Sequence, residues 1–460
     1  MHYKKNIEKQ VKRILIISHG EVKARMAGPA IRCWEFSRVL SAHLPTTLAT
    51  PNSVPESFQQ QTSAICQAYD RGTLLKLAGN HDILLLQGFL LEQYPELEHL
   101  GKIIVVDLYD PFPLESLENP QESAKPLQWQ RHLNNIRVLN RQIILADYMI
   151  CASERQKDYW LGYLTALNRV NPSTYQQGSY QHLLGVVPFG IPEKPMRIRT
   201  NRLRGENAGY GISDKDFVLL WGGGIWDWLD PLTPIRAVAR LAESGSAVKL
   251  FFLGVISPDP NIPQMQMGAK AVELAKELGV YGSHVIFNQH WIPYEDRQYY
   301  LKGADVGICS HFEHLETRFS FRTRALDYLW AQLPIITTCG DTVSDWVERY
   351  DAGNVVGYQS VSEWVQAIQS LQRPSIFRKK REAAGLLQDQ LKWSVATQAL
   401  LTFCQNPTPA ADRVDRNKIK KSLVLDHFPK IRRLSEKWET NGAMGLLKKT
   451  GQRMLRPLKM

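Results

Sequence analysis

Short apolar runs alternate with longer amphipathic stretches along most of the chain. The runs are rich in Val, Ile and Leu and are continuously apolar, which is typical of parallel strands covered on both faces. In the N-terminal part they predict strands at residues 13–18, 83–86, 103–107, 147–151 and 185–189. After residue 215 the rhythm restarts and predicts strands at 217–221, 248–253, 284–287, 305–309 and 334–338.

Helical patterns, such as those at 233–243 and 268–278, separate the predicted strands. Strands that alternate with helices indicate βαβ units and a parallel sheet. Because the series occurs twice, we expect an α/β protein with two doubly wound, Rossmann-like halves. A polar stretch with Pro and Gly at 191–214 predicts the linker between them. Ligands of such sheets bind beyond the carboxyl ends of the strands, so the loops there are the candidate sites.

Three arginines, Arg318, Arg322 and Arg324, cluster in the segment 310–341 just before a predicted helix. The apolar stripe of that helix consists of Ala325, Leu326, Leu329 and Trp330. A cationic turn at a helix N-terminus suits an anion, because unpaired backbone N–H groups and the helix dipole make it positive. Asp327 projects from the first turns of the helix, close to whatever the arginines bind. The alternative is a surface helix with ordinary charged residues.

Two glycine-containing loops follow the first predicted strand of each half. Gly28 and Pro29 begin a helix after the first loop, and Arg32 on its first turn is expected to face the cleft. The alternative there is a plain strand–helix connection. The second loop, GGGIWDWLDP at 222–231, lacks the dinucleotide and Walker fingerprints, but three glycines can still wrap a phosphate. Its tryptophans and Asp227 are expected to shape a sugar pocket, with core packing as the alternative.

Acidic residues and histidines also lie near predicted strand ends. Asp107 and Asp110 follow a strand and are expected to meet sugar hydroxyls, with turn chemistry before Pro111 as the alternative. The histidines near strand exits are His19, His290, His311 and His314. None has metal-ligand spacing, so we assign no metal and expect structural roles for most of them.

Composition narrows the class of protein. A chain of 460 residues with 44% apolar content suits two globular domains. The net charge of +11 is concentrated at 407–460, which hold 14 Lys/Arg and 5 Asp/Glu, so a nucleic-acid-binding core is not expected. The six scattered cysteines favour a reducing compartment. No run of about twenty apolar residues predicts a transmembrane helix.

Taken in order, several segments resemble the retaining glycosyltransferases of the GT-B fold. The group in question is family-four-like and nucleotide-sugar dependent, and it includes sucrose and glycogen synthases and bacterial cell-surface glycan enzymes. The resemblance covers about residues 12–406 and rests on the first strand with MAGPAIRCWEFSRVL, ADYMICASERQKDYW, VVPFGIP, GGGIWDW, the arginine turn with ALDYLWAQLPIITT, and LKWSVATQALL. VVPFGIP matches the turn that ends the family's first domain, and LKWSVATQALL looks like its returning terminal helix.

The resemblance implies two Rossmann-like domains that face each other across a cleft. The expected organisation is a first domain at 1–190, a linker at 191–214, a donor-binding domain at 215–375, returning helices at 376–406 and a basic tail at 407–460. The implied reaction moves a sugar from a nucleotide diphosphate to a glycan, lipid-linked or small-molecule acceptor, with retention of configuration. A diphosphate oxygen takes the acceptor's proton in such a reaction, and neither a metal nor another cofactor is implied.

The chain departs from the family pattern at two places. The family's second-domain pair of glutamates, which has seven residues between its members, falls here on Phe319 and Asp327. Asp327 can accept from a ribose hydroxyl, whereas Phe319 cannot contact a sugar in that way, and Glu316 is the candidate substitute. The glycine loop also lacks the family's Arg and Lys. We therefore expect Arg322 and Arg324, with backbone N–H groups of their turn, to bind the diphosphate.

The expected site residues fall into three groups. Those expected to act in catalysis are Arg322, Arg324, Glu316 and Asp110. Those expected to bind the donor nucleotide and diphosphate are Gly222, Gly223, Gly224, Ser320, Phe321, Arg322, Thr323 and Asp327. Those expected to contact a donor or acceptor sugar are Gly28, Arg32, Trp226, Asp227 and His314.

Two further classes of function stay open beside sugar transfer. One is a nucleotide-sugar epimerase or non-glycosidic coupling enzyme of the same fold, and the other is a non-catalytic nucleotide-sugar binding protein. The basic amphipathic segment 415–460 favours either an anionic membrane surface or a solvated tail. We expect a cytoplasmic protein, which would be peripheral on the inner face of the membrane if that segment binds lipid.

Overall fold

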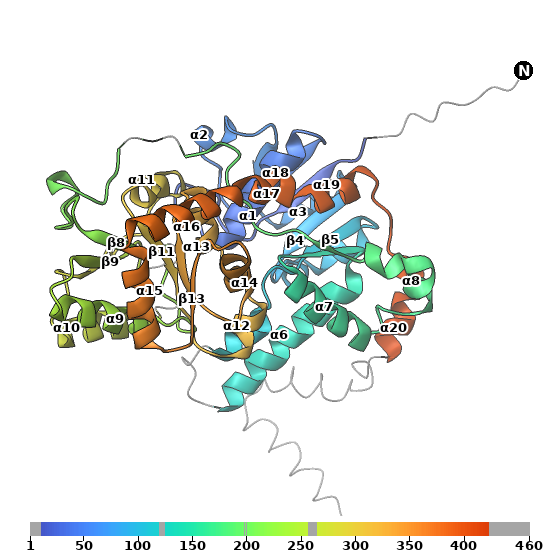
Figure 1. Cartoon of the computed structure of the whole chain (residues 1–460). Coiled ribbons are helices and arrows are strands. Elements are labelled where there is room, and N and C mark those ends of the chain that lie inside the picture. Colours follow the sequence, from blue (N-terminus) through green and yellow to red (C-terminus); the bar gives the residue numbers. More distant parts are fainter. Residues whose placement is uncertain (1–10, 119–124, 197, 199, 256–264, 423–460) are drawn as a thin grey trace, which may run out of the picture.

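Two parallel β-sheets, each covered by helices on both faces, make up the protein (Figure 1). The computed structural model describes residues 11–118, 125–196, 198, 200–255 and 265–422. Most of the expected tail, 415–460, therefore lies outside the described residues. We call the sheet at 14–186 with its helices the first lobe, and the sheet at 217–356 with its helices the second lobe.

The first sheet has seven strands in the order β3-β2-β1-β4-β5-β6-β7, and every neighbouring pair is parallel. Its strands are β1 (Ile14–Ile17), β2 (Thr46–Thr50), β3 (Ile65–Ala68), β4 (Ile83–Gln87), β5 (Ile103–Asp107), β6 (Tyr148–Cys151) and β7 (Leu184–Val186). The helices of this part are α1 (Gly28–Ser41), α2 (Glu56–Gln59), α3 (Arg71–Gly79), α4 (Leu90–Gln93), η1 (Pro95–His99), α5 (Phe112–Glu115), η2 (Ser116–Glu118), α6 (Lys125–Leu145), α7 (Glu154–Ala166), α8 (Pro172–Tyr175) and η3 (Gln176–His182).

The second sheet has six parallel strands in the order β10-β9-β8-β11-β12-β13. Its strands are β8 (Phe217–Trp221), β9 (Val248–Phe252), β10 (Val285–Phe287), β11 (Val306–Cys309), β12 (Ile335–Thr338) and β13 (Gly353–Val356). The remaining helices are η4 (Glu206–Ala208), α9 (Leu232–Glu243), α10 (Gln266–Glu277), η5 (Tyr294–Asp296), α11 (Arg297–Leu301), α12 (Leu315–Phe319), α13 (Arg324–Trp330), α14 (Thr342–Arg349), α15 (Val361–Leu371), α16 (Pro374–Leu386), α17 (Gln388–Leu391), α18 (Trp393–Ala396), α19 (Gln398–Gln405), η6 (Arg413–Asp415) and α20 (Arg416–Ser422).

The doubly wound architecture predicted from the apolar runs is confirmed, but three strands were not predicted. β2 is fully buried, yet three threonines interrupt its apolar run. β3 and β13 lie at the sheet edges, where fewer positions are buried and the continuous apolar signal of a central strand is lost. The missed strands are therefore those with the weakest hydrophobic pattern.

A hydrophobic core joins the two lobes. Phe189 in the segment after β7 packs against Phe321 of the second lobe at 6.2 Å and against Trp393 at 5.8 Å between ring centroids. Helices α18 and α19 return to the first lobe, where Phe403 stacks on Tyr148 at 4.1 Å. These contacts join residues of both lobes in one hydrophobic core.

The chain crosses between the lobes at two neighbouring places. On the first pass Ile191 leaves the first lobe, and on the second pass Leu391 and Trp393 return to it. The backbone N–H of Ile191 donates to the carbonyl of Leu391 at 2.7 Å, and that of Trp393 donates to the carbonyl of Ile191 at 3.1 Å. The two crossings are therefore hydrogen-bonded to each other.

Candidate functional site

A cavity of about 210 Å³ lies between the lobes at the carboxyl ends of the strands of the second sheet. The loops after β8, β9 and β10 and the start of α13 form its second-lobe side, and residues 26–31, which include the first turn of α1, cover it from the first lobe. Two hydrogen bonds to backbone carbonyls join the lobes beside the cavity. Arg25 Nε donates to the carbonyl of Trp291 at 2.8 Å, and the N–H of Tyr294 donates to the carbonyl of Ala24 at 2.8 Å.

Glycines form the cavity wall directly after β8. Gly222, Gly223 and Gly224 all line the cavity. The N–H of Gly222 donates to the hydroxyl of Tyr328 at 2.7 Å, and this bond fixes where the loop leaves the strand. Gly223 has a φ of +75°, a conformation that L side chains rarely adopt. Because these three residues have no side chains, the backbone itself forms this part of the cavity wall.

Arg324, at the first position of α13, is held against this loop with part of its guanidinium unpaired. Its guanidinium carbon lies 4.6 Å from the ring centroid of Trp221, and Nη2 donates to the carbonyl of Gly224 at 3.0 Å. Nη1 is buried and has no hydrogen-bond partner among the described residues. Burial lowers the pKa of Arg324, because no carboxylate compensates for the lost hydration. A cation in this state is a strong candidate for binding an anion.

Asp327 and Arg297 form an ion pair on the opposite part of the wall. Arg297 Nε lies 2.9 Å from Asp327 Oδ1, and its guanidinium stacks 3.6 Å from the ring centroid of Tyr294. Both side chains line the cavity, and Asp327 keeps about a third of its side-chain surface exposed. Its second oxygen is therefore available to accept a hydrogen bond.

The structure corrects the expectation that Arg322 faces the bound anion. Arg322 forms a two-bond ion pair with Glu316, at 3.0 Å and 2.7 Å, and both side chains are buried. Neither residue lines the cavity. Glu316 is consequently occupied by Arg322 and is not free to replace the acid missing at Phe319.

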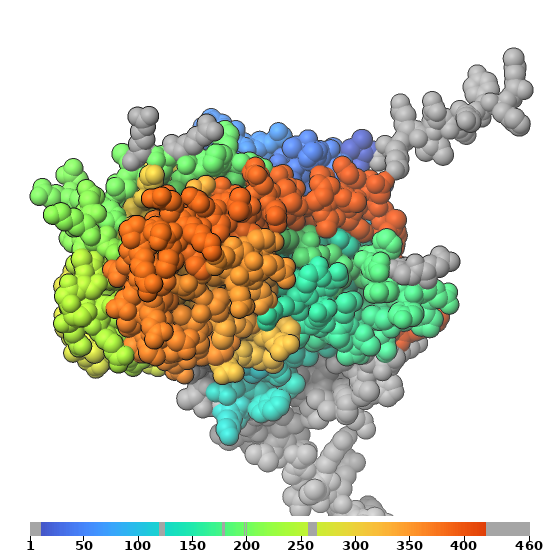
Figure 2. Space-filling view, in the orientation of Figure 1, coloured from blue at the N-terminus to red at the C-terminus, as the bar shows by residue number. Residues whose placement is uncertain are grey.

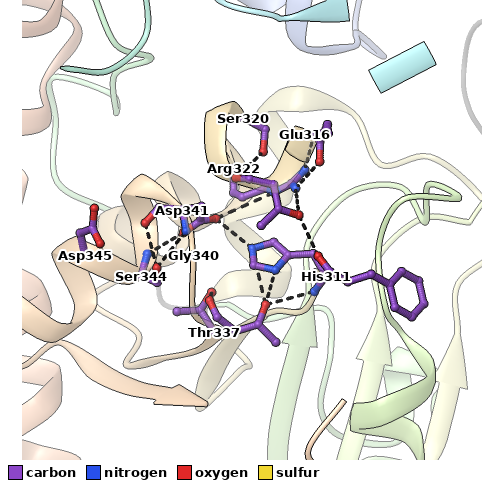
Figure 3. Close-up of polar contacts among 12 residues, drawn as sticks. His311, Glu316, Ser320, Arg322, Thr337, Gly340, Asp341, Ser344 and Asp345 are labelled. Carbon is purple, nitrogen blue, oxygen red and sulfur yellow. Dashed lines mark hydrogen bonds and ion pairs between the residues drawn. The ribbon is translucent and has the colours of Figure 1, made fainter. Parts of the chain in front are cut away.

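Figure 3 shows that this ion pair belongs to a polar network at the ends of β11 and β12. Arg322 Nε lies 3.9 Å from Asp341 Oδ2, and the same oxygen lies 3.1 Å from His311 Nε2. Asp341 also caps α14 by accepting from the N–H of Ser344 at 2.7 Å. Burial raises the pKa of Asp341 to about 6 and lowers the pKa of His311 well below its ordinary value. His311 is therefore uncharged at neutral pH.

The first lobe contacts this network through α7. Arg155 binds Asp345 at 2.7 Å and 2.9 Å, and its Nη1 donates to the carbonyl of Gly340 at 2.8 Å. Gln156 donates to the carbonyl of Phe319 at 2.8 Å, and the Phe319 ring lies 4.7 Å from that of Tyr159. Phe319 thus takes part in an interlobe contact.

Asp110 lies at the same lobe junction, outside the residues that line the cavity. It is hydrogen-bonded to Glu115, and Glu316 and Arg322 of the second lobe influence it electrostatically. Burial, followed by the negative charge of Glu316, raises the pKa of Asp110 to about 7. Burial also raises the pKa of Glu115. The two acids therefore share a region where ionisation is disfavoured.

Arg32 does not face the cleft, contrary to the prediction from its place on the first turn of α1. It is fully buried, with Nε 2.6 Å from Asp107 Oδ2 and Nη2 2.7 Å from the carbonyl of Val187. The rings of Phe36 and Phe189 lie within 4.7 Å of its guanidinium. Because Asp107 is committed to this pair, it too is unavailable for a sugar hydroxyl.

The remaining predicted residues divide between the cavity and the protein interior. Gly28, Thr323 and Trp226 line the cavity. The residues that do not line it are Ser320, Phe321, Asp227 and His314. Their side chains have local partners instead: Asp227 accepts from the N–H at the start of α10, His314 caps α12, and Phe321 packs in the interlobe core.

Several cavity residues were missed by the sequence analysis. They are Met26, Ala27, Ile31, Phe189, Gly190, Leu253, Gly254, Trp291, Ile292, Tyr294, Arg297, Leu326 and Trp393. The sequence did offer an indication for Trp291, Ile292, Tyr294 and Arg297, because they lie in the polar and aromatic segment that follows the carboxyl end of β10. In the described parts of the chain, no cluster of potential ligands suits a metal ion, and no helix is both long and apolar enough to cross a bilayer.

No family model matches the sequence, and no curated protein matches it. Solved structures do match over most of its length. HepE from Anabaena, in complex with UDP and glucose, has a TM-score of 0.59 at 12% identity over 85% of this chain and 98% of HepE. Sucrose-phosphate synthase from Thermosynechococcus elongatus has a TM-score of 0.58 at 16% identity over 86% and 98%. WaaG, a glycosyltransferase involved in lipopolysaccharide biosynthesis, has 0.57 at 15% identity over 86% and 100%.

The chain has the GT-B fold. The fold predicted by resemblance is thereby confirmed, with two Rossmann-like lobes and a cavity between them. In this GT-B chain the strand ends of the second lobe carry the glycine loop, Arg324 and Asp327. The first lobe contributes Gly28 and its neighbours from the opposite side.

The acids at the lobe junction predict an unusual dependence of stability on pH. Folded Asp110 binds its proton more tightly than the unfolded residue, whose pKa is near 3.8, so the free energy of unfolding falls as the pH rises from there to about 7. We expect Asp110→Asn to show a smaller fall over that range, measured by urea unfolding at several pH values. Asp158→Asn on the exposed side of α7 is the control. An unchanged slope in Asp110→Asn would contradict the assignment.

Proposed function

We propose that the protein is a glycosyltransferase that uses a nucleotide-diphosphate sugar as donor. One observation carries the proposal: Arg324, whose Nη1 has no hydrogen-bond partner among the described residues, lines a cavity whose wall includes the glycine loop after β8. A diphosphate needs both cationic charge and backbone N–H donors, and this wall offers both. The matched GT-B structures support the proposal, since HepE was solved with UDP and glucose.

The other cavity residues suit the rest of a nucleotide. Asp327 has a carboxylate oxygen that can accept from a ribose hydroxyl, while Arg297 fixes its orientation at 2.9 Å. Trp291 and Ile292 supply apolar surface for a base on the same side. We assign these roles as part of the proposal, with the diphosphate between the ribose and the first lobe.

The proposed reaction gains most from stabilising the leaving group. As the bond to the sugar breaks, negative charge develops on the diphosphate, and Arg324 with the N–H groups of the glycine loop stabilises that charge. The acceptor attacks the face from which the diphosphate leaves, so that the configuration is retained and a diphosphate oxygen takes its proton. Residues 26–31 of the first lobe, which include the first turn of α1, cover the cavity, and this limits hydrolysis by water.

The acceptor would enter from the first lobe, where Asp110 and Glu115 lie at the junction. A neutral Asp110 can donate a hydrogen bond to an acceptor hydroxyl. We propose a glycan, lipid-linked or small-molecule acceptor, with cell-surface polysaccharide synthesis on the cytoplasmic side as the setting. The basic segment 415–460 would then hold the protein at an anionic membrane.

A thermal-shift screen tests donor binding directly. A ligand that binds only the native state raises Tm, so nucleoside diphosphates and their sugars are expected to stabilise the protein, by about 3 kcal/mol at a concentration of 100 times Kd. The matching nucleoside monophosphates should give a smaller shift, because they lack the second phosphate. Release of nucleoside diphosphate with a sugar added to an acceptor would then identify transfer. Absence of any shift across the screen would refute the proposal.

A further inference from the structure

Tyr294, in the second lobe, is held by two hydrogen bonds from the first lobe. Its backbone N–H donates to the carbonyl of Ala24 at 2.8 Å, and its hydroxyl donates to Glu35 Oε1 at 3.2 Å. Ala24 precedes α1 and Glu35 lies on it, so both acceptors belong to the first lobe. Burial raises the pKa of Tyr294 well above its ordinary value, and the hydroxyl therefore keeps the proton that it donates. The first lobe thus fixes both the backbone and the side chain of Tyr294.

The ring of Tyr294 in turn supports the cavity residue Arg297. The guanidinium carbon of Arg297 lies 3.6 Å from the centroid of this ring and 5.1 Å from that of Trp330. Its Nη1 donates to the carbonyl of Tyr294, and its Nε donates to Asp327 Oδ1 at 2.9 Å. Continuous contacts therefore lead from α1 of the first lobe to the carboxylate of Asp327 in the cavity.

Glu35 is a buried carboxylate that does not line the cavity. Arg38, on the same helix, pairs with it at 2.9 Å. Burial raises the pKa of Glu35, and the positive charges of Arg38 and Arg297 oppose that rise. A buried carboxylate is costly unless other groups compensate for its lost hydration. Part of that compensation comes from Tyr294 and Arg297, so it is complete only when the second lobe is in place.

The lobes also meet at a second place, which does not involve Tyr294. On the face drawn in Figure 2 the surface of α7, in teal-green, adjoins that of the second lobe, in orange. There Arg155 of α7 binds Asp345 of α14 at 2.7 Å and 2.9 Å. This junction offers a matched control, because it joins the same two lobes without any printed bond to Arg297 or Asp327.

We propose that Tyr294 is a positioning residue for the ribose of the nucleotide donor, and that Glu35 of the first lobe holds Tyr294 in place. A carboxylate selects a hydroxyl only where its orientation is fixed, since a hydrogen bond weakens steeply with misalignment. The orientation of Asp327 depends on Arg297, whose own position depends on Tyr294. Selectivity for ribose is thus set in part by a first-lobe side chain that does not touch the nucleotide. This inference rests on the proposed donor site.

A ratio of two dissociation constants tests the proposal. Isothermal titration calorimetry of the full chain compares the nucleoside diphosphate that gives the largest thermal shift with the same diphosphate lacking both ribose hydroxyls. A general loss of affinity or folding weakens both ligands alike, so a change in the ratio of their Kd values reports the contact with ribose. Tyr294→Phe keeps the ring over Arg297 but loses the bond to Glu35, and Glu35→Leu removes the acceptor. Glu35→Gln keeps an acceptor oxygen, and Asp327→Ala is the reference without the carboxylate.

We expect the unmodified protein to bind the ribose form at least about tenfold more tightly than the form without hydroxyls, and Asp327→Ala to bind the two about equally. Tyr294→Phe and Glu35→Leu should each lower the ratio at least about threefold. Glu35→Gln and the control Arg155→Ala should keep the ratio of the unmodified protein, with Tm as the check on folding.

Three results would count against the proposal, and they have different meanings. A full ratio in both Tyr294→Phe and Glu35→Leu, beside a lost ratio in Asp327→Ala, would overturn this inference and leave the donor site standing. A full ratio in Asp327→Ala would overturn it as well, since ribose would then be bound by another group. If the unmodified protein bound no nucleoside diphosphate, the proposed function itself would fail.

Discussion

Arg324→Ala is expected to lower kcat/KM for the nucleotide sugar by about 10²- to 10³-fold while the protein stays folded. Arg324 carries the only buried guanidinium nitrogen among the described cavity-lining residues that lacks a hydrogen-bond partner. The positive charge of Arg324 is therefore paired with a negative charge only when an anion binds. Since negative charge on the diphosphate grows as the sugar leaves, the loss should fall on kcat as well as on KM.

Matched variants make this prediction specific. Arg324→Lys keeps the charge but loses the contact with Gly224 and the stacking on Trp221, so partial activity is expected. Arg318→Ala removes an exposed arginine of the same segment and should leave turnover unchanged. Steady-state assays of released nucleoside diphosphate, with Tm as the check on folding, measure all three. If Arg324→Ala turned over normally, another group would have to stabilise the leaving diphosphate.

Arg32→Ala is expected to lower the free energy of unfolding by about 3–5 kcal/mol. The substitution leaves Asp107 with its charge buried and unpaired, and it removes the hydrogen bond to the carbonyl of Val187. It also empties the space between the rings of Phe36 and Phe189. Urea unfolding measures the loss. An unchanged Tm in this variant would contradict the assignment of Arg32 and Asp107 as a buried ion pair.

The control for Arg32 is an ion pair of the same lobe that faces solvent. Arg71 lies 2.5 Å from Glu96, and both side chains are about half exposed. Arg71→Ala should cost less than about 1 kcal/mol, because water replaces the lost partner. The contrast separates the effect of burial from that of losing an arginine.

Arg32 and Arg324 show which part of the site could be predicted from sequence. Arg32 lies in the first turns of α1 and Arg324 begins α13, and local pattern alone assigned both to the cleft. Their environments differ because Arg32 meets Asp107, which is 75 residues away, whereas Arg324 meets no carboxylate. Local periodicity positions an arginine on an element, but only the packing of distant strands decides its partner.

The same reasoning explains the fate of Arg322 and the omission of Arg297. Arg322 has a local partner, Glu316, six residues before it, yet sequence could not show that the turn between them brings the two groups together. Arg297 follows β10 and reaches the cavity by pairing with Asp327. The βαβ rhythm, in contrast, depends on continuous apolar runs, so the sequence predicted the strands with unbroken runs and missed β2, whose three threonines interrupt its run inside the sheet.

Phe319 illustrates a position where a departure from the family pattern has a structural explanation. Its ring packs on Tyr159 and its carbonyl accepts from Gln156, so the residue joins the lobes. A carboxylate at this place would face an aromatic ring of the first lobe. The resemblance therefore predicted the register of the helix after it, where Asp327 lies in the cavity, but not the role of Phe319 itself.

The paired crossings at Ile191 and Leu391–Trp393 restrict how the lobes can separate. A single connection would let the second lobe rotate in any direction, whereas two connections that are hydrogen-bonded to each other define a hinge axis. Rotation about the line through the two crossings would keep the hydrogen bonds that join them, whereas twisting would break those bonds. Each opening and closing should follow the same arc, so that Arg324 and the loop around Gly28 return to the same alignment after every turnover.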